Sequence, residues 1–261
     1  MRFTELIASM REEGGTYHQA IPPEWSQGRT AYGGLTASMC LAAAQNAFSG
    51  LPPLRSAQIG FVGPAAGKAV IACELLRQGK STSFVAADLR AEAGLATRAL
   101  LVFGAARESK IAHLDLSPPD LPPLDPSKLL PTGSSFPAFL SQFDIHIARG
   151  GVPFSGRGEH RSFWWVRHRD EEARAGILPL IALADIQPPA IAPVIEGPAP
   201  VSSVTWQVDL LSDDPQTEDG WYLVETSAEW AGGGWSSQKM TVWDRSLRPV
   251  ASHRQSVVVF T

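Results

Sequence analysis

One strand-rich segment occurs twice in this 261-residue chain, and this repeat limits the possible folds more than any other feature. The run Gly79–Val102 aligns without a gap with the run Gly234–Val257. In this register Leu100 lies opposite Gln255, so an apolar side chain in the first copy matches an amide in the second. A repeated unit predicts two similar structures side by side. The divergence at one core-like position suggests that one copy keeps a site and the other keeps only packing.

The first copy belongs to a longer series of expected elements. A short amphipathic helix is expected over residues 3–12, a strand over 17–21 and a helix over 35–48. The second helix is apolar almost all round, which predicts that it is buried. Four strands bounded by glycine or polar turns follow, over residues 54–62, 69–78, 82–91 and 96–105. A buried helix followed by an antiparallel meander predicts an α+β unit in which the helix packs on a curved sheet.

The second half of the chain repeats this order. Strands are expected at 139–148 and 160–168, a helix at 170–185, and strands at 201–211, 221–230, 236–243 and 249–260. Residues 107–135 are rich in proline, which predicts a stiff, extended connection rather than an element. We therefore expect a first unit over 1–106, a linker over 107–135 and a second unit over 136–261.

Composition excludes several classes of protein. The chain is 44% hydrophobic and 18% charged with a net charge of -4, which favours a folded core and gives no basic face for nucleic acid. No apolar run approaches the roughly 20 residues of a membrane span. The N-terminus lacks the basic segment followed by an apolar segment that is typical of a signal peptide. The two cysteines, Cys40 and Cys73, and the six histidines show no disulfide or metal-binding spacing. We expect a cytoplasmic protein without a metal or cofactor.

Two common catalytic motifs are absent from the sequence. The run Gly63–Lys68 is one residue too short for a phosphate-binding loop and leads into an expected strand rather than a helix. No G-x-S-x-G motif is present, so the usual signal of a serine nucleophile is missing.

Several local motifs together resemble type II, TesB-like acyl-CoA thioesterases. They are the run Tyr17–Gly34, which ends in Gln-Gly-Arg-Thr-Ala-Tyr-Gly-Gly, the turn Phe61–Pro64 and the run Glu74–Ser83. The resemblance covers nearly the whole chain and is more specific in its first half. It implies a double hotdog fold, in which an antiparallel sheet wraps a long helix in each of two units. The α+β pattern of helix and meander, present twice, agrees with this expectation.

The resemblance also implies an activity and a set of site residues. Members of the family are thought to hydrolyse acyl-CoA without a covalent intermediate, using an Asp, a Thr or Ser and a Gln of the second hotdog to orient a water. Asp185 at the end of the second expected helix, Ser203 early in the next strand and Gln255 in the last strand match these roles. The match is most direct for Gln255, because Val250–Gln255 follows the family pattern Val-Ala-Ser-x-x-Gln. Ser202 stays open as an alternative to Ser203.

The sequence departs from the family pattern in two places near these residues. Thr205-Trp206 stands where the family often has Asp-His, and the segment between Asp185 and Ser203 is short and rich in proline. These departures affect the expected shape of the pocket and the choice of the hydroxyl residue.

Physical arguments favour the same residues. Asp185 follows a run of aliphatic residues, so burial is expected to raise its pKa toward the working pH of a general base. Gly33 and Gly34 open the buried helix, where free N–H groups without nearby side chains suit an oxyanion, and Tyr32 beside them is an expected substrate contact.

The alignment of the two copies predicts one active site per chain. Aligning the two helices from Gly34 and Gly176 places Ala43 opposite Asp185, and Leu100 already lies opposite Gln255. Ser56 can be placed opposite Ser203. The first copy therefore lacks the acid and the amide, and we expect it to supply walls of the pocket.

Two other functions remain open at this point. A non-catalytic acyl-CoA-binding protein would keep the pocket without needing Asp185 and Gln255 together. A hotdog dehydratase or hydratase would use a catalytic histidine. The two expected long helices, 35–48 and 170–185, contain no histidine. In each case the expected partner is a small-molecule acyl-CoA, and paired hotdogs suggest a homo-oligomer, a dimer or higher.

Overall fold

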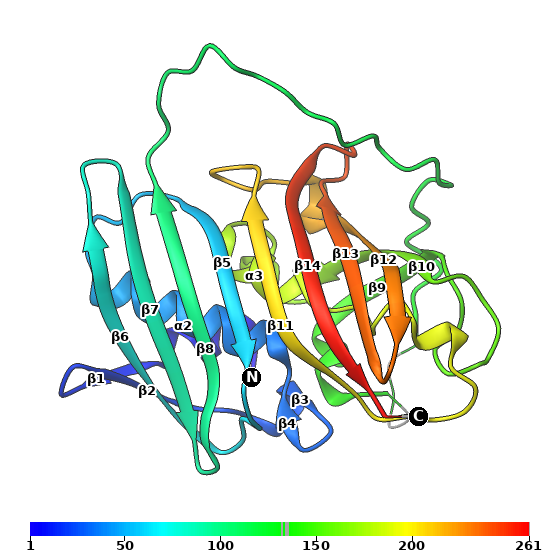
Figure 1. Cartoon of the computed structure of the whole chain (residues 1–261), viewed down its shortest axis with the longest axis horizontal. Coiled ribbons are helices and arrows are strands. Elements are labelled where there is room, and N and C mark those ends of the chain that lie inside the picture. Colours follow the sequence, from blue (N-terminus) through cyan, green and yellow to red (C-terminus); the bar gives the residue numbers. More distant parts are fainter. Residues whose placement is uncertain (132, 134–135, 261) are drawn as a thin grey trace.

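A single antiparallel sheet of twelve strands forms the framework of the computed structural model (Figure 1). The structure describes residues 1–131, 133 and 136–260, so positions 132, 134 and 135 of the expected linker and position 261 of the expected second unit lie outside the described residues. The strand order is β1-β2-β6-β7-β8-β5-β11-β14-β13-β12-β10-β9. Helices α2 and α3 contact each other on one face of this sheet. No helix among the described residues is long and apolar enough to span a membrane.

The first half of the chain contributes the six strands on one side of the sheet and two helices. The helices are α1 (Phe3–Ala8) and the buried α2 (Gly33–Ala47). The strands are β1 (Arg11–Glu13), β2 (Thr16–Ala20), β5 (Leu54–Phe61), β6 (Lys68–Gln78), β7 (Thr82–Ala91) and β8 (Gly94–Gly104). A small separate hairpin, β3 (Ser26–Gln27) with β4 (Thr30–Ala31), precedes α2.

The second half contributes the other six strands and one helix, α3 (Ile177–Ala184). The strands are β9 (Phe143–Arg149), β10 (Arg161–His168), β11 (Val201–Leu210), β12 (Tyr222–Gly232), β13 (Trp235–Trp243) and β14 (Pro249–Val259). Strands β5 and β11 pair antiparallel at the centre, where Gln58 lies opposite Gln207. The order of elements on either side of this pair is the same, so the repeat seen in the sequence becomes two halves of one sheet.

Two expected helices are longer than the structure shows. The helix expected over 170–185 is divided into a 3₁₀ turn, Glu171–Ala173, and α3. The cause is Gly176, whose φ of 97° lies in the left-handed region and cannot continue a right-handed helix. The first helix, expected over 3–12, ends at Ala8 because the following residues pair with β2 as strand β1.

The gapless alignment of the two copies is wrong by one residue at the site position. Ala96 is an extra residue in the β7–β8 ladder, and Val250 is the corresponding extra residue in the β13–β14 ladder. The chain from Val242 to its bulge at Val250 is one residue longer than the equivalent chain from Leu89 to its bulge at Ala96. Aligning the bulges places the buried Leu101, not Leu100, opposite Gln255.

A second pair of bulges corrects the alignment of Ser203. Arg55 is the extra residue between β5 and β8, and Val204 is the extra residue between β11 and β14. Ser203 is therefore equivalent to Leu54, rather than to the expected Ser56. Both corrections support the inferred asymmetry, because each polar residue of the second half replaces a buried leucine of the first.

The linker forms no helix or strand over its described residues, as its prolines predict. In Figure 1 it leaves β8 and crosses over one end of the sheet toward β9. Three of its leucines pack against an aromatic cluster on β10, β12, β13 and the residue before β12. The leucines are Leu116, Leu121 and Leu124, and the cluster comprises Phe163, Trp165, Trp221, Leu223 and Trp243. The linker is thus an apolar cover for part of the second half, which accounts for three of the tryptophans concentrated there.

Candidate active site

A pocket of about 870 Å³ lies between the two halves. The first half lines it with the β3–β4 hairpin, the start of α2, the β5–β6 loop and the β7–β8 turn. The second half lines it with the segment after α3 and the start of β11. Gly33 from the first half and Asp185 and Ser203 from the second are among the lining residues, so the pocket brings together residues predicted from distant parts of the sequence.

Asp185 stands at the C-terminal end of α3, beside the first turn of α2. A Cβ atom added to Gly33 would lie 2.7 Å from Asp185 Oδ2, so only glycine allows this approach. Burial raises the pKa of Asp185 to about 7, although hydrogen bonds from Gln255 and from the Gly34 N–H act in the opposite direction. This is the direction expected from the aliphatic run that precedes it, and it suits a general base near neutral pH.

Gln255 connects the other two predicted residues. It lies on β14 with only 4% of its surface exposed, and its Nε2 donates a hydrogen bond to Asp185 Oδ1. The hydroxyl of Ser203 donates to Gln255 Oε1 at 3.4 Å. The carboxyl, amide and hydroxyl groups therefore form one hydrogen-bonded chain, in which Asp185 and Ser203 line the pocket and the buried Gln255 joins them from behind.

The two neighbouring serines of β11 have different surroundings. Ser203 is partly buried and contacts Gln255, whereas Ser202 is exposed and its hydroxyl donates only to the Ser203 carbonyl at 3.4 Å. Both line the pocket. The contact with Gln255 favours Ser203 as the hydroxyl member of the set.

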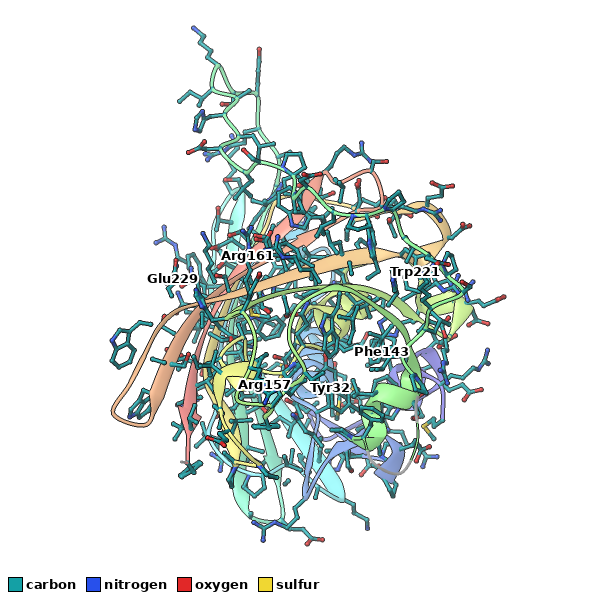
Figure 2. All side chains as sticks on the ribbon, turned by 90° about the vertical axis from the view of Figure 1, so that its right-hand side faces the viewer. Tyr32, Phe143, Arg157, Arg161, Trp221 and Glu229 are labelled. Atoms are coloured by element: carbon teal, nitrogen blue, oxygen red, sulfur yellow. The ribbon has the colours of Figure 1, made fainter. Side chains whose placement is uncertain are left out.

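Tyr32 does not line the pocket, which argues against the substrate contact expected from the sequence. It caps α2, is 1% exposed and stacks on Phe139 with ring centroids 4.1 Å apart. Figure 2 shows its ring in the interior near Phe143. Its hydroxyl donates to the Ala182 carbonyl and so holds the start of α2 against α3. Tyr32 thus joins the helices that carry Gly33 and Asp185.

Replacing Gly34 with alanine is expected to destabilise the fold. The added Cβ atom would collide with the backbone carbonyl of Ala182 and lie 2.7 Å from the Tyr32 hydroxyl. Overpacking of this kind costs about 1–3 kcal/mol, which outweighs the roughly 1 kcal/mol that alanine gains in a helix. Thermal unfolding should show a Tm lower by several degrees than that of Gly60→Ala, because a Cβ atom at Gly60 would meet Val62 Cγ2 at an ordinary contact distance of 3.9 Å. Equal Tm values for the two variants would contradict this packing.

One buried residue of the site was not foreseen from the sequence. Gln238 on β13 is fully buried, and its Nε2 donates to Gln255 Oε1 at 3.0 Å. Its Oε1 accepts from the backbone N–H of Ala190 at 2.8 Å. The available signal was its place in the strand, where it shares the inward face with Met240 and Val242.

A second buried glutamine anchors the segment that follows Asp185. Gln187 lines the pocket and accepts hydrogen bonds from the hydroxyls of Ser162 and Thr226, each at 2.5 Å. Its own amide donates to the Val224 carbonyl. The chain leaving α3 is therefore fixed to β10 and β12 within two residues of Asp185.

Solved structures share this fold over the full length of the chain. A conserved hot dog protein of unknown function from Alicyclobacillus acidocaldarius has a TM-score of 0.87 at 22% identity, over 99% of this chain and 98% of that one. A putative thioesterase II from Thermobifida fusca YX has a TM-score of 0.80 at 18% identity, over 100% and 98% of the two chains. The tesB protein of Mycobacterium avium subs paratuberculosis has 0.79 at 17% identity, over 99% and 98%. These likenesses show the double hotdog fold.

The family follows from matches to the sequence itself. No curated protein matches this chain. The model of the acyl-CoA thioesterase N-terminal domain matches residues 21–104, and that of the acyl-CoA thioesterase C-terminal domain matches residues 117–259. These matches, the second of which alone covers more than half of the chain, show that the chain is a thioester hydrolase that belongs to the acyl-CoA thioesterase family.

Proposed function

We propose that the protein hydrolyses an acyl-CoA thioester to a carboxylic acid and coenzyme A by direct attack of water, with Asp185 as the general base. The observation that supports this most is the hydrogen-bonded set of Asp185, Gln255 and Ser203 at a pocket lined by both halves. A base with a pKa of about 7 is half ionised near neutral pH, so it can both take up and return a proton there.

The proposed reaction has two steps. In the first, Asp185 accepts a proton from a water held near Ser203 and Gln255, and the water oxygen forms a bond to the thioester carbonyl carbon. In the second, the carbonyl re-forms, the carbon–sulfur bond breaks and the protonated Asp185 returns its proton to the leaving thiolate. The products are the carboxylic acid and the coenzyme A thiol, and no bond to the protein forms.

The developing oxyanion needs a fixed hydrogen-bond donor. Among the described residues, the Gly34 N–H is already directed at Asp185, whereas the Gly33 N–H at the start of α2 has no hydrogen-bond partner. Gly33 also lines the pocket. We therefore assign the oxyanion contact to the Gly33 N–H, and assign Gly34 to holding Asp185.

The proposal places one active site in each chain. The positions equivalent to Gln255 and Ser203 in the first half are Leu101 and Leu54, both buried and unable to orient a water. The equivalence of Ala43 with Asp185, like the division of the chain into 1–106, 107–135 and 136–261, stays a prediction from the sequence. So do the cytoplasmic location and the expected homo-oligomer.

The pH dependence follows from the ionisation of Asp185. Because the base must be deprotonated, kcat/KM should rise as the pH increases through about 7 and then level off. An unburied aspartate would instead give full activity well below pH 6. Initial rates of thiol release between pH 5 and 9 measure this profile. A midpoint near the ordinary aspartate pKa would contradict the assignment of the base.

Thiol release from a panel of acyl-CoAs of different chain lengths tests the function itself. Hydrolysis of at least one member, with equal amounts of acid and coenzyme A, supports the proposal. Binding of acyl-CoA with no hydrolysis across the panel would favour the non-catalytic binding protein. Addition of water to, or its loss from, the acyl chain with the thioester intact would favour a dehydratase or hydratase.

A further inference from the structure

Gln238 lies next to Gln255 in the sheet but does not line the pocket beside Asp185. The two glutamines are register partners on β13 and β14, and both side chains point to the inner face. Gln238 has no exposed surface, so every polar atom of its amide must find its partner within the protein. The identity of those partners determines how both amides are oriented.

The backbone N–H of Ala190 fixes the orientation of the Gln238 amide. The N–H of Ala190 can only donate, so the atom of Gln238 that faces it at 2.8 Å must be the oxygen. The Gln238 amide nitrogen then faces Gln255, which requires Gln255 to present its own oxygen at 3.0 Å. The remaining group of Gln255, its NH₂, is thereby directed at Asp185 Oδ1.

These contacts form a closed ring. We call the contacts from the Ala190 N–H through Gln238 and Gln255 to Asp185 the amide relay. Ala190 lies only five residues after Asp185, so the backbone joins the two ends of the relay. If the Gln255 amide were reversed, its oxygen would face the Asp185 carboxylate without a proton between them. Its nitrogen would also face the nitrogen of Gln238. The relay therefore excludes the reversed state by two unfavourable contacts rather than one.

We propose that Gln238 is a positioning residue for thioester hydrolysis, which orients the Gln255 amide so that its N–H groups face Asp185 and its oxygen can accept from Ser203. This inference rests on the proposed function, because it gives Gln255 a role in holding the catalytic carboxylate. Gln238 itself touches neither the water nor the thioester. Its effect is passed on through the orientation of Gln255.

The orientation of Gln255 should be visible in the titration of Asp185. The N–H donated by Gln255 favours the ionised carboxylate and so lowers its pKa from the value that burial alone would give. Losing that donor should raise the pKa and move the rise of kcat/KM to higher pH. A loss of packing alone would reduce the amount of folded enzyme without moving this midpoint.

Other charged or titratable groups around Asp185 do not produce the same effect. Tyr32 on α2 interacts with Asp185, but burial raises the tyrosine pKa, so it stays neutral across this range. Arg29 and Glu92 line the same pocket, but neither is among the groups that shift the pKa of Asp185. His253, two residues from Gln255 on β14, is buried with its pKa lowered to about 3, so it also stays neutral.

The test compares Gln238→Met and Gln238→Glu with the parent and with Gln58→Met. Methionine fills similar space but neither donates to Gln255 nor accepts strongly from Ala190. A protonated glutamate presents one O–H donor and one acceptor as glutamine does, and it loses the donor when it ionises. Gln58 is exposed on β5, so its replacement by methionine controls for the substitution itself. Each variant is assayed for kcat, KM and pH profile, and the Asp185 carboxyl is titrated by carbon-13 NMR.

The substitution of Gln238 is expected to lower kcat without a comparable change in KM. Gln238→Met should lose kcat on the order of tenfold, the equivalent of one hydrogen bond, with little change in KM. Its Asp185 titration and the rise of kcat/KM should both move to higher pH. Gln238→Glu should stay closest to the parent at low pH and fall further behind as the pH increases. Gln58→Met should match the parent throughout.

Two outcomes would overturn the inference. One is a folded Gln238→Met enzyme that titrates Asp185 at the same pH as the parent, whatever its activity. The other is a Gln238→Glu enzyme whose activity relative to the parent does not change with pH, and this comparison decides the matter if Gln238→Met does not fold. A parent that hydrolyses no acyl-CoA would defeat the proposed function instead, and the NMR titration would still test the relay.

Discussion

Replacing Asp185 with asparagine is expected to lower kcat for acyl-CoA hydrolysis by about 10²–10⁴-fold, the usual contribution of a general base. Asparagine keeps the size of the side chain and can still accept the Gln255 hydrogen bond, but it cannot take up the proton of the attacking water. Substrate binding should change little, so the loss should appear in kcat rather than in KM. Thiol release under saturating acyl-CoA measures it.

The same substitution should stabilise the protein at high pH. In the folded chain the pKa of Asp185 is raised from 3.8 to about 7, so ionising it opposes folding. This penalty is present above pH 7 and disappears as the pH falls toward 3.8. Because Asp185 is partly exposed at the pocket, solvent screening reduces this penalty, and we expect a gain of roughly 1–3 kcal/mol for Asp185→Asn at pH 8. Thermal unfolding should show the higher Tm at pH 8 and a smaller difference at pH 5.

A matched control separates this effect from the general loss of a carboxylate. Asp209 lies on β11 and does not line the pocket. Asp209→Asn should therefore keep the parental kcat and show no comparable pH-dependent gain in Tm. An Asp185→Asn enzyme with the kcat of the parent would show that the base has been wrongly assigned.

Replacing Gln255 with leucine should reduce kcat by about 10²-fold, within the range that single groups contribute to transition-state stabilisation. Leucine is the residue at the equivalent position of the first half, Leu101, so the substitution restores the symmetry of the two copies at this position. It removes the donor to Asp185 and the acceptor for Ser203. The rise of kcat/KM should also move to higher pH, because Asp185 loses a hydrogen bond that lowers its pKa.

The cost in stability should be of similar size when both effects are expressed as free energies. Gln255→Leu leaves the buried amide of Gln238 without one of its partners, which costs about 1–3 kcal/mol. Gln58→Leu on the exposed face of β5 should retain full activity. If Gln255→Leu kept both the parental kcat and the parental pH profile, the amide would have no part in the reaction.

Local patterns in the sequence were sufficient to predict most of the sheet. The strand expected over 82–91 coincides with β7, because turn residues bound an alternating pattern on both sides. The prediction of one helix over 170–185 was wrong, because the helix is interrupted at Gly176. An apolar pattern continues across that glycine, and only the backbone shows that its φ is positive.

Three members of the candidate site were predicted from the sequence, but Gln238 and the register between the two halves were not. Asp185, Ser203 and Gln255 were each identified from the sequence, and the structure brings them into one hydrogen-bonded chain. The equivalent residues of the first half could not be identified, because each depends on a β-bulge. A bulge is set by pairing between strands, so a gapless alignment places Leu100 where the sheet places Leu101.

The proposed mechanism divides the site between the two halves of the sheet. The first half contributes the start of α2, with its Gly33 N–H, and the walls of the pocket. The second half contributes the carboxyl, hydroxyl and amide groups. Neither half alone would bring a carboxylate within reach of a free helix N–H, so the central pairing of β5 with β11 is part of the site.

The most direct test of this account is the number of ligand molecules that one chain binds. Isothermal titration of the parent with a thioether analogue of acyl-CoA, which cannot be hydrolysed, gives this number at equilibrium. One molecule per chain is expected, bound at the pocket of Asp185. Two molecules per chain would contradict it, because the first half would then hold a binding site of its own.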